Sequence, residues 1–138
     1  MDKKKLLIFG ATLLGLIILG LILMLVFKKE PQEEFKIDGI DLPENKEVLK
    51  DTQVEDLKIT NVSIITRDGK SSFTASVENT SDTSTKINTL TIVFYEGDNK
   101  LEAIALYNTE LYSNQKTNIK LTIEKDLTKT NKIEYILK

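Results

Sequence analysis

Residues 57–77 read LKITNVSIITRDGKSSFTASV, two runs of alternating apolar and polar residues on either side of a tight-turn signal. Alternation rich in Thr, Ile and Val is typical of half-buried strands, and Asp68-Gly69 tolerates the positive φ that a two-residue hairpin turn needs. The apolar residues of the first run change parity near Asn61, as they do where a β-bulge inserts one residue. The stretch therefore predicts a β-hairpin with a bulge in its first strand.

The same alternation recurs four more times toward the C-terminus, with polar turn segments between the runs. These runs lie at about residues 87–95, 101–111, 119–123 and 133–137. Six short strands at a spacing of about 8–12 residues are typical of an all-β antiparallel sandwich, in which two sheets pack on their apolar faces. A small closed barrel is the alternative that the pattern leaves open.

The strand predicted at residues 87–95 shows which side chains form the core. Leu90, Ile92 and Phe94 share one face, and the period of two places Val93 and Tyr95 on the other. Later in the chain, the polar segment 126–131 is long enough to cross from one sheet to the other. We therefore expect Phe94 to point inward, between Ile92 and the opposite sheet.

The run Ala75-Ser76-Val77-Glu78-Asn79-Thr80-Ser81-Asp82 resembles the FxLYD domain of bacterial membrane-anchored and lipid-anchored proteins. The signature of that family falls on residues 92–96, which read IVFYE, so that Tyr95 is retained while similar residues replace the others. The usual Pro-Gly-Glu turn is replaced by Ser113-Asn114-Gln115. The resemblance covers about 80 residues, from 57 to 137. It implies an immunoglobulin-like or fibronectin-type sandwich and no particular activity.

The N-terminal region contains an uncharged apolar stretch, Leu6–Phe27, with Lys3-Lys4-Lys5 before it and Lys28-Lys29 after it. As a helix it would span about 33 Å, enough for the roughly 30 Å hydrocarbon core of a bilayer. A secretory signal peptide has a shorter apolar stretch and a small-x-small cleavage site, which is absent here. The stretch therefore predicts one uncleaved transmembrane helix that anchors the protein in the lipid bilayer.

Lysine is in excess before this helix, and the lysines after it are diluted by glutamates, which favours an N-terminus in the cytoplasm. The predicted organisation is a cytoplasmic tail at 1–5, a transmembrane helix at 6–27, an acidic linker at 28–55 and an extracellular β-sandwich at 56–138. The linker assignment rests on charge, because residues 30–56 contain ten acidic residues against three lysines. The sequence leaves open whether residues 35–50 add a strand to the sandwich.

The composition excludes several kinds of chemistry. The chain has no cysteine and no histidine, so it lacks thiol nucleophiles, the commonest general base and the usual zinc ligands. The nearest approach to a calcium loop, Glu96-Gly97-Asp98-Asn99, lacks the ligand order of an EF-hand and predicts a hairpin turn. We expect no enzyme activity, no catalytic, cofactor-binding or metal-binding residues, and no cofactor.

The tyrosines and the charge distribution indicate which partners the domain can bind. The four tyrosines, Tyr95, Tyr107, Tyr112 and Tyr135, can serve as binding anchors, but the sequence favours a role in capping the core. Nucleic acid is not an expected partner, since the near-neutral domain has scattered lysines. The sequence therefore predicts a non-catalytic interaction module for a protein or a cell-wall polymer. The alternative is an accessory subunit of a membrane complex that is recognised through its transmembrane helix.

Overall fold

The computed structural model describes residues 12, 14–22 and 38–138. The chain divides into two compact units, Met1–Phe35 and Lys36–Lys138, which are considered separately. In the first unit Thr12 and residues 14–22 are helical. Within the described residues, no helix reaches the length and apolar character needed to cross a membrane. The rest of the predicted transmembrane helix, the tail at 1–5 and the linker up to residue 37 lie outside the described residues.

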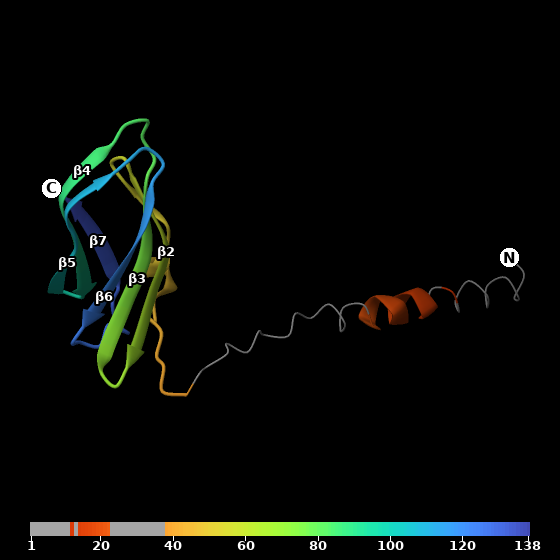
Figure 1. Ribbon diagram of the computed structural model, residues 1–138. Helices are drawn as coiled ribbons and strands as arrows, with labels where there is room; N and C mark the ends of the chain where they lie inside the picture. Colours follow the sequence, from red (N-terminus) through yellow and green to blue (C-terminus); the bar gives the residue numbers. More distant parts are fainter. Residues whose placement is uncertain (1–11, 13, 23–37) are drawn as a thin grey trace, which may run out of the picture. The chain divides into compact units, whose positions relative to one another are not determined.

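The second unit contains a 3₁₀ helix and seven strands in its described part (Figure 1). They are η1 (Lys46–Leu49), β1 (Thr52–Val54), β2 (Leu57–Arg67), β3 (Lys70–Asn79), β4 (Thr85–Glu96), β5 (Asn99–Leu111), β6 (Lys116–Ile123) and β7 (Lys132–Leu137). One sheet has the order β1-β2-β3-β6 and the other the order β5-β4-β7, and all neighbouring strands are antiparallel. The two sheets form a sandwich, so the barrel alternative is wrong.

The predicted hairpin and its bulge are confirmed. β2 and β3 pair down to Arg67 opposite Lys70, and the two turn residues between them have the expected positive φ, 52° at Asp68 and 75° at Gly69. The pairing shifts between Thr60 and Ser63, where Asn61 has a φ of 53°. The extra residue keeps apolar side chains on the inner face on both sides of the bulge.

The core lies between the sheets and is built from alternate residues of the long strands. Its buried members are Leu57, Ile59, Val62, Ile64, Phe73, Ala75, Val77, Ile87, Leu90, Ile92, Phe94, Leu111, Ile119, Ile123 and Leu127. The inward direction predicted for Phe94 is therefore confirmed. Leu127 lies in the connection from β6 to β7, which crosses between the sheets, as the length of segment 126–131 allows.

The predicted acidic linker ends earlier than expected, because residues 38–55 belong to the sandwich unit. Asp41 and Thr66 exchange two backbone hydrogen bonds of 2.8 Å, and the Glu44 amide donates to the Thr128 carbonyl at 2.8 Å. Val48 is buried, and β1 adds a short edge strand to β2. The acidic composition gives no sign of this packing, because several of the contacts are backbone hydrogen bonds, which leave no trace in side-chain polarity.

One buried amide joins the two sheets at one end of the sandwich. The Asn79 side chain is fully buried at the end of β3, and its nitrogen donates to the carbonyls of Thr83, Leu111 and Tyr112 at 2.7, 2.9 and 3.2 Å. Its oxygen accepts hydrogen bonds from the amide and hydroxyl of Ser81. The polar segment 79–84, one of the turn segments expected between the strands, is thus fixed to the end of β5.

Candidate functional site

The outer face of the β5-β4-β7 sheet carries three rows of side chains that follow from the strand register. Leu90, Ile92 and Phe94 face the core, so the residues between them face outward together with their cross-strand partners. The rows are Ile104–Thr91–Ile136, Glu102–Val93–Glu134 and Lys100–Tyr95–Lys132. Val93 lies on this outer face as predicted, yet it is 1% exposed and so is covered by its neighbours there.

The charged side chains of this face are paired with one another. The Tyr95 hydroxyl donates to the Glu134 carboxylate at 2.7 Å, and the Lys132 ammonium lies 4.9 Å from the centre of the Tyr95 ring. The hydrogen bond to Glu134, with some burial, raises the pKa of Tyr95. Lys100 binds Glu102 at 2.9 Å, which raises the pKa of Lys100 and lowers that of Glu102. These residues leave little unbalanced charge for a charged ligand.

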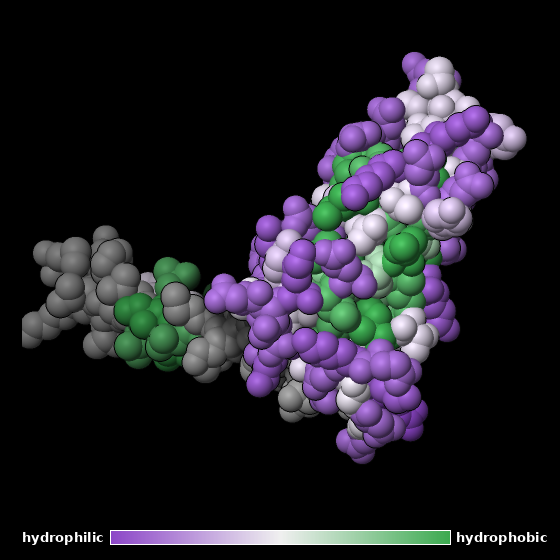
Figure 2. All heavy atoms as spheres, turned by 90° about the vertical axis from the view of Figure 1, so that its left-hand side faces the viewer, coloured by the Kyte–Doolittle hydropathy of each residue, from purple (hydrophilic) through white to green (hydrophobic). Residues whose placement is uncertain are grey.

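The part of this face beyond the charged rows, around Thr91, carries apolar side chains that are exposed to solvent. Ile104 on β5 is 58% exposed, and Ile136 on β7 is half-buried across from Thr91. Tyr107, which pairs with Thr89 further along β5, is 74% exposed. Figure 2 views the side of the molecule that carries this sheet and shows apolar surface near the middle of the domain, bordered by hydrophilic surface. We call the residues Ile104, Tyr107, Thr91 and Ile136 the β5 patch.

Three of the four tyrosines do not cap the core, although the sequence favours that role for all of them. Tyr107 and Tyr112 are 74% and 66% exposed and do not cap the core. Tyr95 lies on the outer face, and only Tyr135 packs against the core cluster. An exposed tyrosine presents a rigid ring and a polar tip, which suits it to anchoring a partner.

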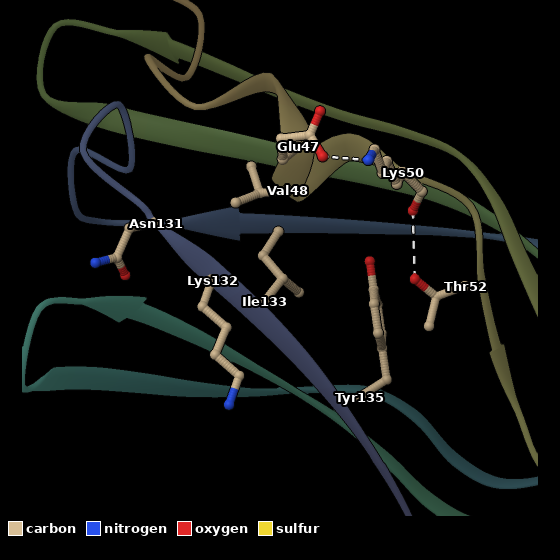
Figure 3. Close-up of a pocket in the computed structure, with 8 residues that line it drawn as sticks. All are labelled: Glu47, Val48, Lys50, Thr52, Asn131, Lys132, Ile133 and Tyr135. Atoms are coloured by element: carbon tan, nitrogen blue, oxygen red, sulfur yellow. Dashed lines mark hydrogen bonds and ion pairs between the residues drawn. The ribbon is translucent and has the colours of Figure 1, made fainter.

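A pocket of about 190 Å³ lies between the η1–β1 segment and β7 (Figure 3). Its lining residues are Glu47, Val48, Lys50, Thr52, Asn131, Lys132, Ile133 and Tyr135. The Tyr135 hydroxyl oxygen is buried and has no hydrogen-bond partner among the described residues. Burial raises the pKa of Tyr135 to about 12, so its hydroxyl keeps its proton at neutral pH. The sequence does not predict this pocket, because one wall comes from residues 47–52, which the acidic composition assigns to the linker.

The acidic turn considered for calcium is a hairpin turn, as predicted. Glu96 pairs with Asn99 across it, and Gly97 adopts a φ of 58°. Over residues 12, 14–22 and 38–138, no group of three or more acidic side chains converges as a metal site would require.

No family model, no curated protein and no solved structure matches this chain. The resemblance to the FxLYD domain therefore stays a prediction from the residues that carry it.

Proposed function

We propose that this protein is a membrane-anchored, non-catalytic interaction module whose extracytoplasmic sandwich binds a protein through the β5 patch. The observation that carries the proposal is the exposure of Ile104 and Tyr107 on β5, with the half-buried Ile136 of β7 across Thr91 from Ile104. Scattered exposed apolar residues are common, whereas a contiguous group with a polar border is typical of protein-binding surfaces.

The chemistry of the β5 patch favours a protein over a charged polymer. The neighbouring charges of Lys100, Glu102 and Glu134 are already paired, so the face offers no excess of either sign. An apolar centre with an exposed aromatic ring suits an apolar or aromatic side chain from a partner protein. Nucleic acid remains an unexpected partner on the same grounds.

The membrane anchor is supported by the sequence of residues 6–27, which is long enough to cross a bilayer and flanked by lysines. The lysine excess at residues 3–5 favours a cytoplasmic N-terminus and an extracellular sandwich. Protease added to intact cells should then remove a tag fused to the C-terminus. A tag that stays protected, or a mature N-terminus after residue 27, would contradict this part of the proposal.

The finer fold assignment is also part of the proposal. If β2 is taken as the first strand of an immunoglobulin-like sandwich, β2-β3-β6 corresponds to strands A, B and E of that fold. In the same way, β5-β4-β7 corresponds to strands C′, C and F. This order supports the immunoglobulin-like or fibronectin-type arrangement that the FxLYD resemblance implies.

The test of the binding function compares two exposed isoleucines on opposite sheets. Ile104→Lys places a charge in the β5 patch, and Ile65→Lys places one on β2, where the isoleucine is 41% exposed. Partners are crosslinked in intact cells to the tagged full-length chain and quantified. We expect Ile104→Lys to lose a partner that Ile65→Lys retains.

A third variant separates the two candidate functions. Here residues 6–27 are exchanged for an unrelated membrane anchor while the sandwich stays unchanged. If every partner survives Ile104→Lys and is lost on exchange of the anchor, the β5 patch is not the binding surface. That outcome would favour an accessory subunit recognised through its transmembrane helix.

A further inference from the structure

The pocket at Tyr135 contains a small apolar surface next to one buried polar group. Val48 from η1 and Ile133 from β7 approach each other on one side of it (Figure 3). The Tyr135 hydroxyl points toward the segment that holds Lys50 and Thr52. With a volume of about 190 Å³, the pocket is smaller than the roughly 300–1,000 Å³ of sites for drug-sized ligands. It therefore suits a single small group rather than a whole cofactor.

The charged residues around the pocket do not favour a charged ligand. Lys50 forms an ion pair with Glu47, and Lys132 lies over the Tyr95 ring and 3.9 Å from Glu134. The cations that line the pocket thus have anionic or aromatic partners. A neutral ligand would enter without breaking any of these interactions.

The polar groups indicate which neutral group fits. The Tyr135 hydroxyl is buried without a hydrogen-bond partner among the described residues. This costs free energy unless an acceptor takes a hydrogen bond from it. The Lys50 carbonyl accepts only a long 3.4 Å hydrogen bond from the Thr52 hydroxyl, so it can still accept another. A donor and an acceptor therefore belong to residues that line the pocket together with the aliphatic side chains of Val48 and Ile133.

We propose that this pocket binds a small neutral amide group of the acetamido type. Its carbonyl oxygen accepts from the Tyr135 hydroxyl, its N–H donates to the Lys50 carbonyl, and its methyl group packs on Val48 and Ile133. N-acetylated sugars and N-acetylated amino groups share this chemistry. The inference goes beyond the binding function of the β5 patch and does not rest on it.

Ligand-observed NMR with the full-length protein tests the proposal with three compounds. N-acetylglucosamine and N-acetylglycine amide carry the acetamido group, and glucose is the matched compound that lacks it. We expect millimolar binding of at least one acetamido compound and at least about tenfold weaker binding of glucose, the loss that one hydrogen bond represents. Binding of the sugar alone indicates an N-acetylated sugar, binding of N-acetylglycine amide alone an N-acetylated amino group, and binding of both the acetamido group itself; each result supports the proposal.

Two conservative variants locate the site. Tyr135→Phe removes only the buried hydroxyl and should weaken binding of the acetamido compounds about tenfold. Tyr107→Phe removes a hydroxyl from the β5 patch and should leave binding unchanged. Because Tyr135→Phe also removes an unpaired buried group, its melting temperature should stay the same or rise, so unfolding will not explain the loss.

The proposal is overturned if neither acetamido compound binds, if glucose binds equally well, or if Tyr135→Phe binds as tightly as the wild type. Ile104→Lys should bind the acetamido compounds normally. Failure of the β5 patch and failure of this pocket are therefore separate results.

Discussion

The rings of Phe73 and Phe94 meet edge to face across the sandwich, with centroids 5.4 Å apart and planes inclined by 74°. Phe73 comes from β3 in one sheet and Phe94 from β4 in the other. This geometry sets the positive edge of one ring against the negative face of the other. Both rings are almost completely buried, so this contact joins an inner strand of one sheet to the central strand of the other.

Replacing Phe94 by alanine should strongly destabilise the sandwich. The change leaves a cavity and removes the ring contact to Phe73, and truncating a buried Phe typically costs about 3–5 kcal/mol. Thr91→Ala is the control, because Thr91 lies on the outer face of the same strand. The free energy of unfolding of this control, measured by denaturant titration with circular dichroism, should change by about 0.5 kcal/mol or less. Similar midpoints for both variants would contradict the inward orientation of Phe94.

The Asn79 amide provides a second test, this time of the junction between β3 and β5. Asn79→Asp keeps the shape but replaces the donor by an oxygen that faces the carbonyls of Leu111 and Tyr112. One unsatisfied buried acceptor costs about 1–3 kcal/mol, and this variant creates more than one. We therefore expect a loss of at least about 2 kcal/mol at pH 7. The exposed Asn88→Asp serves as control and should change stability little.

The stability of Asn79→Asp relative to the wild type should rise as the pH falls. Burial and the facing carbonyls would raise the folded-state pKa of the new carboxyl above its unfolded value. Its protonated form is then favoured in the fold, so the variant should regain stability as the pH is lowered toward 4. Equal destabilisation relative to wild type at pH 4 and pH 7 would show that charge is not the cause.

Side-chain alternation was enough to predict most of the fold, because each strand of the sandwich has one buried face. The six predicted strands, the bulge at Asn61 and the turn at Asp68-Gly69 all have local signals in the sequence. The role of Asn79 has no such signal, since it stands among other polar turn residues. Its burial depends on the distant end of β5, which places carbonyls of Leu111 and Tyr112 around it.

The candidate sites were less predictable than the strands. Tyr107 was considered as a binding anchor, but its exposure depends on how β5 lies at the edge of its sheet. The Tyr135 pocket joins Val48 to Ile133, residues that are distant in the sequence. Nothing in the acidic composition around Val48 indicates that its segment returns to β7.

Ionisation of Tyr135 should make the fold less stable at high pH. Burial raises its folded-state pKa from 10.0 to about 12, so the unfolded chain loses this proton first as the pH rises. The contribution to stability is therefore complete below pH 10 and disappears between pH 10 and about 12. Absorbance of tyrosinate should show a last step near pH 12 that is missing in Tyr135→Phe. A wild-type titration complete by pH 11 would contradict the burial of this hydroxyl.

The domain boundary at Lys36 predicts how truncation affects stability. A fragment of residues 51–138 lacks the exchange of hydrogen bonds between Asp41 and Thr66 and the buried Val48, which the fragment Lys36–Lys138 retains. Burying a Val side chain contributes about 1.5–3 kcal/mol, part of which offsets the entropy of ordering the segment. We expect the free energy of unfolding of the shorter fragment to be about 1–2 kcal/mol lower than that of the longer one. In the longer fragment, the amides of Asp41 and Glu44 should exchange slowly with solvent, because both donate to backbone carbonyls. Rapid exchange at both amides, with equal stability of the two fragments, would mean that residues 38–50 belong to the linker after all.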